Sequence, residues 1–328
     1  MTKIIGIGNA LVDVLTNIEK NDILNELNLP QGGMTLIDDA QFEQMKATLS
    51  KRTTSLATGG SAANTIKALA QLGAAPGFIG KIGMDSYGDA FSQGCKTAHI
   101  DAHLILTDQQ TGVASTFISK NGERTFATYL GAAANLMPED LTIEMLKAYD
   151  YLYVEGYLVF NKPLILHIVK LAKKAGLKIC LDMASYNIVE SNLELFHILL
   201  EEYVDIVFAN EEESKSFTGK NPEEALAELS EYCDTAIVKV GARGAYARRE
   251  DKVAFAPAEN VKEVIDTTGA GDYFAAGFLY GFSAGKPLET CLKMGSILSG
   301  AIIQHVGATL SNDIWNEINI KITETEKI

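Results

Sequence analysis

The sequence predicts an α/β protein with a mainly parallel sheet and helices on both faces. From about residue 150, short apolar runs alternate with segments whose apolar residues recur at helical spacing; the runs are 151–156, 177–182, 204–209 and 235–240. Strands that are apolar throughout are typical of parallel sheets, because helices cover both faces. Ligands of such sheets bind at the carboxyl ends of the strands, so the candidate positions are Glu155–Gly156, Asp182, Asn210–Glu213 and Gly241–Gly244.

Two regions lie outside this alternation. Segment 112–130 is rich in β-branched and aromatic residues around an Asn-Gly pair at 121–122, which predicts a β-hairpin. A hairpin is antiparallel, so it is expected apart from the main sheet, either as a flap over a ligand site or as a structural edge. The C-terminal third is predicted to be helical over 271–284 and 287–304, and the tail from Ile318 is expected to fray.

Composition limits the possible functions. The chain has 328 residues, 47% of them hydrophobic and 21% charged, as in ordinary globular proteins. Asp and Glu total 42 against 28 Lys and Arg, so the formal net charge is −14. This balance argues against a nucleic-acid-binding protein and against binding to anionic membranes. A phosphate compound would have to be bound locally, by backbone NH groups and a metal ion.

Cysteine usage and the N-terminus predict a cytoplasmic protein. Cys95, Cys180, Cys233 and Cys291 are widely spaced and form no zinc-binding pattern. They are expected to be buried free thiols in a reducing compartment. The sequence contains no run of 18 apolar residues, so no membrane-spanning helix is predicted. The N-terminal segment carries Asp13 and no cleavage site of small residues, so it is expected to be a first strand rather than a signal peptide.

The sharpest motif is Asp-Thr-Thr-Gly-Ala-Gly-Asp at 266–272, followed by a helical run. Gly269, Ala270 and Gly271 would present successive backbone NH groups at a helix N-terminus, which favours an anion. Asp272, in the first turn, either stabilises the helix dipole or takes a proton from a nucleophile that attacks there. A base beside an anion hole is the minimal apparatus for phosphoryl transfer to an alcohol.

A second glycine-rich motif, Gly-Gly-Ser-Ala-Ala-Asn at 59–64, begins another predicted helix. Ser61 is expected to be its N-cap, and Gly73 is expected to end it. The glycines either allow close helix packing or let Gly60 approach a polyol. In the second case, Asn64 supplies a paired donor and acceptor.

The first strand is followed by Gly-Asn-Ala-Leu-Val-Asp at 8–13, which does not match the dinucleotide fingerprint because position 11 is Leu. The phosphate-binding pattern GxxxxGK[ST] is also missing from the sequence, so hydride-transfer and P-loop enzymes have little support. Asp13 either binds sugar hydroxyls or lies in water. Asp85 is expected to cap a helix.

Together these segments resemble the PfkB/ribokinase family of carbohydrate and nucleoside kinases. Stretches 59–73, 80–88 and 266–278 are similar to its two signature regions in order and separation, and the resemblance covers nearly the whole chain. It implies a ribokinase-like, doubly wound α/β domain with a small β lid, and transfer of the ATP γ-phosphate to a CH2–OH group. The main domain is expected to comprise residues 1–10, 40–100 and 131–328. The lid is expected to comprise residues 11–39 and 101–130.

The resemblance also implies roles for individual residues. Asp272 matches the catalytic base, and Gly269, Ala270 and Gly271 match the anion hole. The family positions that bind the hydroxyls of the acceptor match Asp13, Gly60 and Asn64. Asn210 and Glu213 fit the NxxE motif, which acts on the Mg2+–phosphate network, often through water; Mg2+ prefers few carboxylates with waters and phosphate oxygens.

For the nucleotide, the resemblance implies ATP contacts in the loop from Lys239 through Gly241 to Gly244, and near Gly307. Glycines at these positions would let the backbone approach ATP. Asp266, with the loop near Gly307, resembles the monovalent-cation site of many members, which implies K+ as a further cofactor beside ATP and Mg2+.

The acceptor is a small molecule of the sugar or nucleoside class. Segments 8–15 and 130–141 favour the adenosine-kinase-like branch, and Tyr157 and Phe160 are aromatic residues that could stack a base. A carbohydrate kinase that acts on ribose, fructose or a keto-deoxy sugar acid is the alternative. A non-catalytic sugar or nucleotide sensor is a remote one, and monomer and homodimer both stay open.

Overall fold

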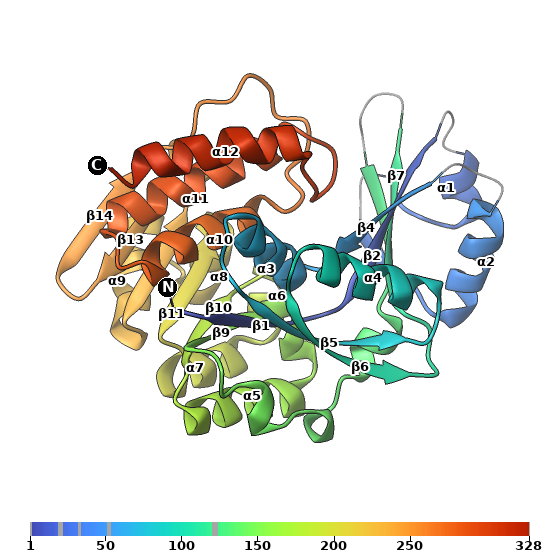
Figure 1. The fold of residues 1–328 in the computed structure, drawn as a ribbon, viewed down its shortest axis with the longest axis horizontal. Helices are drawn as coiled ribbons and strands as arrows, with labels where there is room; N and C mark the ends of the chain where they lie inside the picture. Colours follow the sequence, from blue (N-terminus) through green and yellow to red (C-terminus); the bar gives the residue numbers. More distant parts are fainter. Residues whose placement is uncertain (1, 19–21, 32–33, 51–53, 120–123, 328) are drawn as a thin grey trace.

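The computed structural model describes residues 2–18, 22–31, 34–50, 54–119 and 124–327, which form two separate sheets (Figure 1). The larger sheet has nine strands in the order β14 (Lys252–Ala256), β13 (Ala245–Arg249), β12 (Thr235–Lys239), β11 (Ile206–Asn210), β10 (Lys178–Asp182), β9 (Tyr151–Glu155), β1 (Ile4–Ile7), β5 (Gly77–Gly83) and β6 (Asp101–Thr107). The strands from β12 to β6 run parallel, and β13 and β14 add an antiparallel edge. The mainly parallel sheet is therefore confirmed.

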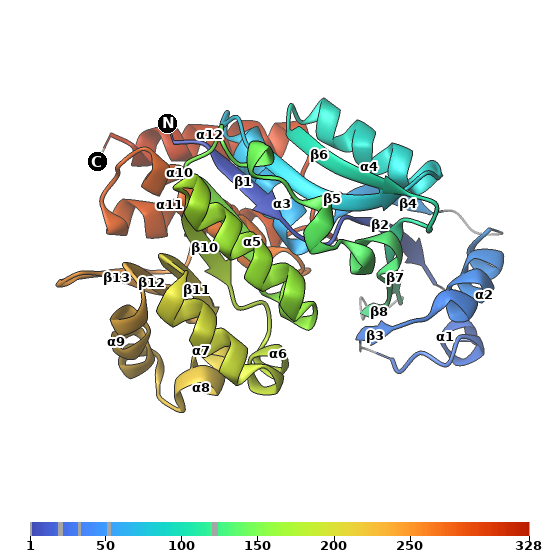
Figure 2. The same cartoon turned by 90° about the horizontal axis from the view of Figure 1, so that it is seen from below.

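Helices cover both faces of this sheet (Figures 1 and 2). The described helices of the chain, of which α1 and α2 belong beside the smaller sheet, are α1 (Asp22–Glu26), α2 (Asp39–Leu49), α3 (Ser61–Gln71), α4 (Ser86–Thr97), α5 (Lys162–Ala175), α6 (Tyr186–Ser191), α7 (Leu193–Glu202), α8 (Glu211–Thr218), α9 (Pro222–Tyr232), α10 (Ala270–Ser283), α11 (Leu288–Ile302) and α12 (Asn312–Thr325). Short 3-10 helices occupy Gly131–Asn135, Pro138–Asp140, Ile143–Met145, Gly156–Phe160 and Gly241–Arg243. Among the described helices, none is long and apolar enough to cross a bilayer.

The strands form two hydrophobic cores because alternate side chains point to opposite faces. In β9, Tyr153 packs with the helices α3, α10 and α11, whereas Leu152 and Val154 pack with α5 and α7. In β11, Phe208 and Val207 divide between the same two cores. This two-sided burial explains the continuously apolar strands in the sequence, as the doubly wound architecture requires.

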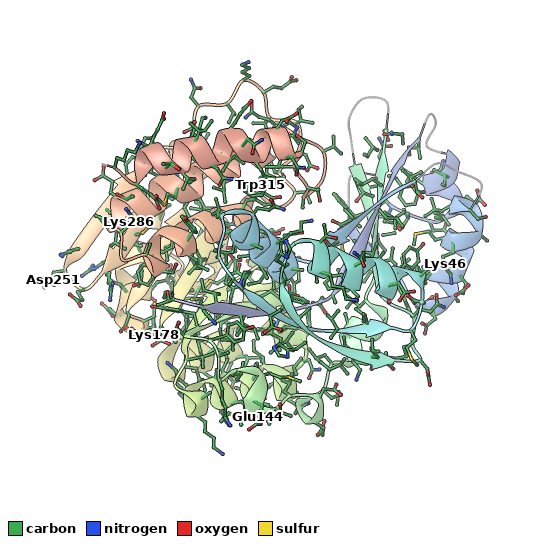
Figure 3. All side chains as sticks on the ribbon, in the orientation of Figure 1. Lys46, Glu144, Lys178, Asp251, Lys286 and Trp315 are labelled. Carbon is green, nitrogen blue, oxygen red and sulfur yellow. The ribbon has the colours of Figure 1, made fainter. Side chains whose placement is uncertain are left out.

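The smaller sheet has five strands in the order β3 (Met34–Leu36), β8 (Arg124–Tyr129), β7 (Gly112–Ile118), β2 (Leu11–Asn17) and β4 (Ser55–Gly59). It lies apart from the larger sheet, with α1 and α2 beside it (Figure 1). The antiparallel β7 and β8 confirm the predicted hairpin, but the Asn-Gly pair at 121–122 lies outside the described residues. On α2, the ammonium of Lys46, labelled in Figure 3, lies 5.0 Å from the Phe42 ring centre.

Two lid boundaries differ from the expected ones. The expected lid segment 101–130 begins with β6, but β6 pairs with β5 in the larger sheet, since its side chains continue that core. Conversely, β4 and α2 fall within the segment 40–100 assigned to the main domain, although β4 pairs with β2 in the smaller sheet. A strand's sheet depends on its hydrogen-bonded neighbour, which its own residues do not specify.

The expectation of a frayed tail from Ile318 is wrong, because α12 continues to Thr325. Ile318 and Ile322 are buried one turn apart on its inner face. Trp315, labelled in Figure 3, stacks on Tyr273 of α10 with ring centres 5.7 Å apart. The four cysteines are free and buried, as predicted.

Candidate active site

A cleft of about 1390 Å³ opens between the two sheets at the carboxyl ends of the parallel strands. The strand-end side chains of Glu155, Asp182, Asn210 and Lys239 line it, together with the N-termini of α3 and α10. The opposite wall is made by residues of the smaller sheet, including Asp13. All of the residues predicted for catalysis, acceptor binding, nucleotide binding and metal binding line this cleft: Asp13, Gly60, Asn64, Asn210, Glu213, Lys239, Gly241, Gly244, Asp266, Gly269, Ala270, Gly271, Asp272 and Gly307.

Asp272 lies in the first turn of α10, where two side chains of α3 hold its carboxylate. The Ser61 hydroxyl donates to Oδ1 over 2.7 Å, and the Asn64 amide donates to Oδ2 over 3.0 Å. Burial raises the pKa of Asp272 to about 6, opposed by these two hydrogen bonds. The carboxylate is therefore oriented and has a proton affinity suited to a general base near neutral pH.

Ser61 is not the N-cap of α3 as expected. Gly60 occupies that position with φ +97°, a backbone conformation that favours glycine, and it makes no side-chain cap. The Ser61 hydroxyl is directed to Asp272 instead. A cap assignment from sequence assumes a local partner, whereas this partner lies on another helix.

At the start of α10, which amides are free differs from the expectation in one residue. The Ala270 amide donates to the Thr267 carbonyl over 3.1 Å. Within the described part of the chain, the Gly271 and Asp272 amides have no hydrogen-bond acceptor. Free amides at a helix N-terminus bind anions, and Gly269 makes the turn with φ +76°.

Lys239, at the end of β12, lies beside this helix start. Its ammonium donates to Asp182 over 3.1 Å, and it would be 3.3 Å from a Cβ at Gly271. Burial alone lowers the pKa of Lys239, but the carboxylates of Asp182 and Glu213 raise it above its ordinary value. The cleft therefore keeps one firmly charged cation next to the free amides.

Asn210 and Glu213 bind each other at the start of α8. The Glu213 carboxylate accepts from the Asn210 backbone and side-chain amides, both over 2.7 Å, and the Asn210 side chain accepts from the Glu213 amide over 2.8 Å. Burial raises the pKa of Glu213 to about 7. With its oxygens engaged in this way, the pair fits contact with a hydrated Mg2+ better than direct ligation.

Three glycines line the part of the cleft that the resemblance assigns to ATP. Gly241, Gly244 and Gly307 line it with φ values of +58°, +124° and +77°, so side chains there would strain the backbone. The Asp266 carboxylate accepts from the Thr268 and Gly307 amides, each over 2.7 Å, which brings together the two segments that the sequence paired. Arg243 is exposed and donates to Glu211 over 2.7 Å, away from the cleft lining.

Asp13 lies within β2 rather than in a loop after the first strand, which corrects its expected placement. Its carboxylate occupies the space where a Cβ of Gly59 would be. Within the described residues, no hydrogen bond to this carboxylate is formed. Burial raises the pKa of Asp13 to about 7, although the Lys67 ammonium opposes the shift. Such a carboxylate in a cleft is available for donors of a ligand.

The sequence assigned no role to Glu155, Asp182 or Lys67. Glu155 and Asp182 were candidate ligand-binding positions only because each stands at the end of a predicted strand. Lys67 could have been recognised as a lysine on the apolar face of α3, where it donates to Thr58 and Thr309 over 3.1 Å each.

The comparisons with known proteins agree with this fold. The pfkB family of carbohydrate kinases matches residues 32–315. A probable sugar kinase from Rhizobium etli CFN 42 superimposes with a TM-score of 0.86 at 30% identity, over 99% of each chain. An adenosine kinase from Sinorhizobium meliloti does so with a TM-score of 0.86 at 29% identity, over 98% of this chain and 99% of its own.

A curated relative is the 5-dehydro-2-deoxygluconokinase of Bacillus subtilis, 29% identical over 83% of this chain and 88% of its own length. The mainly parallel sheet, the small second sheet and these matches define a ribokinase-like phosphotransferase fold. The chain belongs to the pfkB family of carbohydrate kinases and is a phosphotransferase.

Proposed function

We propose that this kinase transfers the γ-phosphate of ATP to the primary hydroxyl of a neutral ribosyl compound, with a ribonucleoside such as adenosine as the first candidate. The observation that carries the acceptor class is the charge of the cleft. Among its described lining residues, Lys239 is the only basic side chain, and it is paired with Asp182.

The acceptor end supports a neutral molecule with adjacent hydroxyls. Asp13 and Asp272 present carboxylates there. Asn64 of α3 donates to Asp272, and its buried side-chain oxygen lacks a partner within the described residues. Carboxylates and an amide suit hydroxyl groups. An acidic acceptor would meet like charges in a partly buried space, which disfavours binding.

The walls around these polar groups are largely apolar, which supports an acceptor with a base as well as a sugar. The lining includes Leu15, Leu36 and Phe126 of the smaller sheet together with Tyr157 and Phe160, which follow β9. Aromatic and aliphatic side chains of this kind bury a planar ring well. A free sugar would leave much of this apolar surface in water.

The proposed chemistry is general-base catalysis at an anion site. Asp272, held by Ser61 and Asn64, takes the proton of the acceptor hydroxyl as its oxygen attacks phosphorus. The amides of Gly271 and Asp272 and the Lys239 ammonium stabilise the negative charge on the transferring group. Excluding water from this end of the cleft, where the smaller sheet faces Asp272, limits hydrolysis of ATP.

Asn210 and Glu213 would hold a hydrated Mg2+, which neutralises phosphate charge when bound. The described residues contain no cluster of three or more His, Cys, Asp or Glu side chains that could ligate a metal. This agrees with an ion that the phosphates and waters hold for the most part. The K+ site near Asp266 stays a prediction.

A sugar acid is the second candidate, because the curated relatives with 26–29% identity are named 5-dehydro-2-deoxygluconokinases. The deciding experiment compares kcat/KM for adenosine, guanosine, cytidine, ribose, fructose and a keto-deoxy sugar acid with ATP and Mg2+. We expect a nucleoside to exceed every free sugar by about tenfold or more, which corresponds to roughly 1.4 kcal/mol. A sugar acid that exceeds all nucleosides would overturn the neutral-acceptor proposal and leave the kinase assignment intact.

A further inference from the structure

Glu155 is a buried carboxylate at the end of β9 that takes no part in the proposed chemistry. Only 1% of its surface is exposed. Three donors converge on it: the Asn9 amide over 2.8 Å and the Asn9 side-chain amide over 2.5 Å at Oε1, and the Ala62 amide over 2.9 Å at Oε2. Burial raises the pKa of Glu155 to about 7, but these donors favour its ionised form.

The Ala62 contact places Glu155 at the start of α3. This helix begins after Gly60, which supplies no side-chain cap, so its first amides need partners from elsewhere. Glu155 supplies one of them and adds a negative charge near the positive end of the helix dipole. A Cβ at Gly8 would collide with the Glu155 carboxylate, so the end of β1 leaves room for this arrangement.

The same helical turn holds the proposed base. Ser61, directly before Ala62, donates to one Asp272 oxygen, and Asn64 donates to the other. Thr65 also donates to the Asp272 carbonyl over 3.2 Å. The link from Glu155 to Asp272 therefore passes through one turn of α3.

We propose that Glu155 is a positioning residue for phosphoryl transfer, which fixes the first turn of α3 and with it the two side chains that orient the Asp272 carboxylate. The inference rests on the proposed function, because it assigns the chemistry to Asp272. Misplacement of a reacting group by about 1 Å can cost roughly 10²-fold in rate. A group that fixes this turn therefore affects kcat without touching the acceptor.

Glu155→Gln tests this link because it removes charge at nearly constant shape. The amide of Gln has a single acceptor oxygen, so it cannot accept from both the Asn9 and Ala62 backbone amides through separate oxygens. We expect kcat to fall by about tenfold to a hundredfold, while the acceptor KM stays within about threefold of the parent. A ligand of the acceptor would instead raise KM and weaken discrimination against a deoxy analogue.

The pH profile separates a positioning residue from a second catalytic base. The charged groups around Asp272 are Asp182 and Lys239 at the ends of β10 and β12, Asp13 in β2 and Glu155 at the end of β9. Because the pKa of Glu155 is about 7 and that of Asp272 is about 6, Glu155 is largely protonated where Asp272 titrates. Glu155→Gln should therefore leave the acid limb of kcat near pH 6 in place, and loss of that limb contradicts a positioning role.

Hydrogen exchange tests the anchoring without turnover, which separates this inference from the proposed function. Amides at the start of α3 should exchange faster in Glu155→Gln than in the parent. Glu213→Gln is the matched control, since it also alters a buried carboxylate of the cleft, but one in the first turn of α8 that contacts Asn210 rather than α3. Exchange in α3 should not change in this variant. If no acceptor in the panel is phosphorylated, the proposed function fails while the exchange result still stands.

A double-mutant cycle with Ser61→Ala asks whether Glu155 acts through α3. Because both side chains serve the orientation of Asp272, the combined loss in kcat should be smaller than the product of the single losses.

Should Glu155→Gln fail to fold, Asn9→Ala provides a second variant. It removes one of the three donors to Glu155 and should lower kcat about twofold to fivefold. Parental α3 exchange, full additivity or a raised acceptor KM at unchanged kcat would each overturn the positioning role.

Discussion

The two walls of the cleft differ in where their polar groups find partners. On the wall of the larger sheet, Asp272 is held by α3, Lys239 by Asp182, and Glu213 by Asn210. On the wall of the smaller sheet, Asp13 forms no hydrogen bond within the described residues, and it shares this wall with the apolar side chains of Leu15, Leu36 and Phe126.

Under the proposed function, this difference separates chemistry from recognition. Groups that must act in a fixed geometry are positioned before any ligand binds, which lowers the cost of reaching the transition state. Groups that recognise the acceptor are left for it to satisfy, so an acceptor that lacks a hydroxyl leaves a buried carboxylate unpaired. Changes on the larger-sheet wall should therefore affect kcat, and changes on the smaller-sheet wall should affect KM.

The largest effect is expected for Asp272→Asn. Loss of the general base should lower kcat by roughly 10²–10⁴, whereas ATP affinity should change little because the amides of α10 remain. Steady-state kinetics with nucleotide-binding calorimetry measure both quantities. Full turnover by this variant would remove Asp272 from the mechanism and with it the assignment of chemistry to this wall.

Gly271→Val should follow, with kcat lowered by roughly 10²–10³, the usual cost of losing one anion-hole donor. A Cβ at this position would be 3.3 Å from the Lys239 ammonium, and the branched side chain would extend towards the phosphate. Gly271→Ala is the graded control and should lose less. Normal thermal unfolding with parental turnover in the Val variant would contradict the anion-hole assignment.

Asp13→Asn tests the other wall. We expect kcat/KM for the acceptor to fall by about tenfold to a hundredfold, mainly through KM, because an amide no longer accepts two hydroxyl donors equally. The preference for a ribonucleoside over its deoxy analogue should also shrink. An effect confined to kcat would break the division between the two walls.

The carboxylates of Asp13 and Asp272 together predict the pH dependence of kcat/KM. Burial raises the pKa of Asp13 to about 7 and that of Asp272 to about 6, both above the ordinary 3.8. Each acts in its ionised form, so kcat/KM should fall as the pH drops through 7 and again through 6. In Asp13→Asn the upper step should disappear from the kcat/KM profile, while the lower step stays in kcat.

The smallest effect is expected for Asn210→Ala with Glu213→Ala. Removing groups that contact a hydrated ion should raise the Mg2+ concentration for half-maximal rate by a few fold, on the order of one kcal/mol or less. The lost cap should also cost about 1 kcal/mol of stability, which thermal unfolding measures. An unchanged Mg2+ titration would leave this pair as a structural cap of α8.

The strongest local patterns predicted most of the larger sheet and the residues that line the cleft. Strands 151–156 and 204–209 could be recognised because they are apolar throughout, and Asp272 because its glycines and its helix stand next to it in sequence. The membership of β4 and β6 could not be predicted, because each has a pattern that either sheet could accept. The prediction of a frayed tail was wrong because Ile318 and Ile322 pack into a hydrophobic core that exists only in the folded molecule.

The sequence by itself determined the alternating strands and helices, the glycine turns at 269–271 and the family resemblance, since each depends on residues close together in the chain. Tertiary structure alone decided which groups hold the base. Ser61, Glu155 and Asp272 are far apart in sequence, and they meet because parallel strands bring their carboxyl ends, and the helices that follow them, to one edge of the sheet. Burial at that edge then raises the pKa of Glu155 and of Asp272, because desolvation depends on every element packed around the carboxylates and not on their own sequence neighbours.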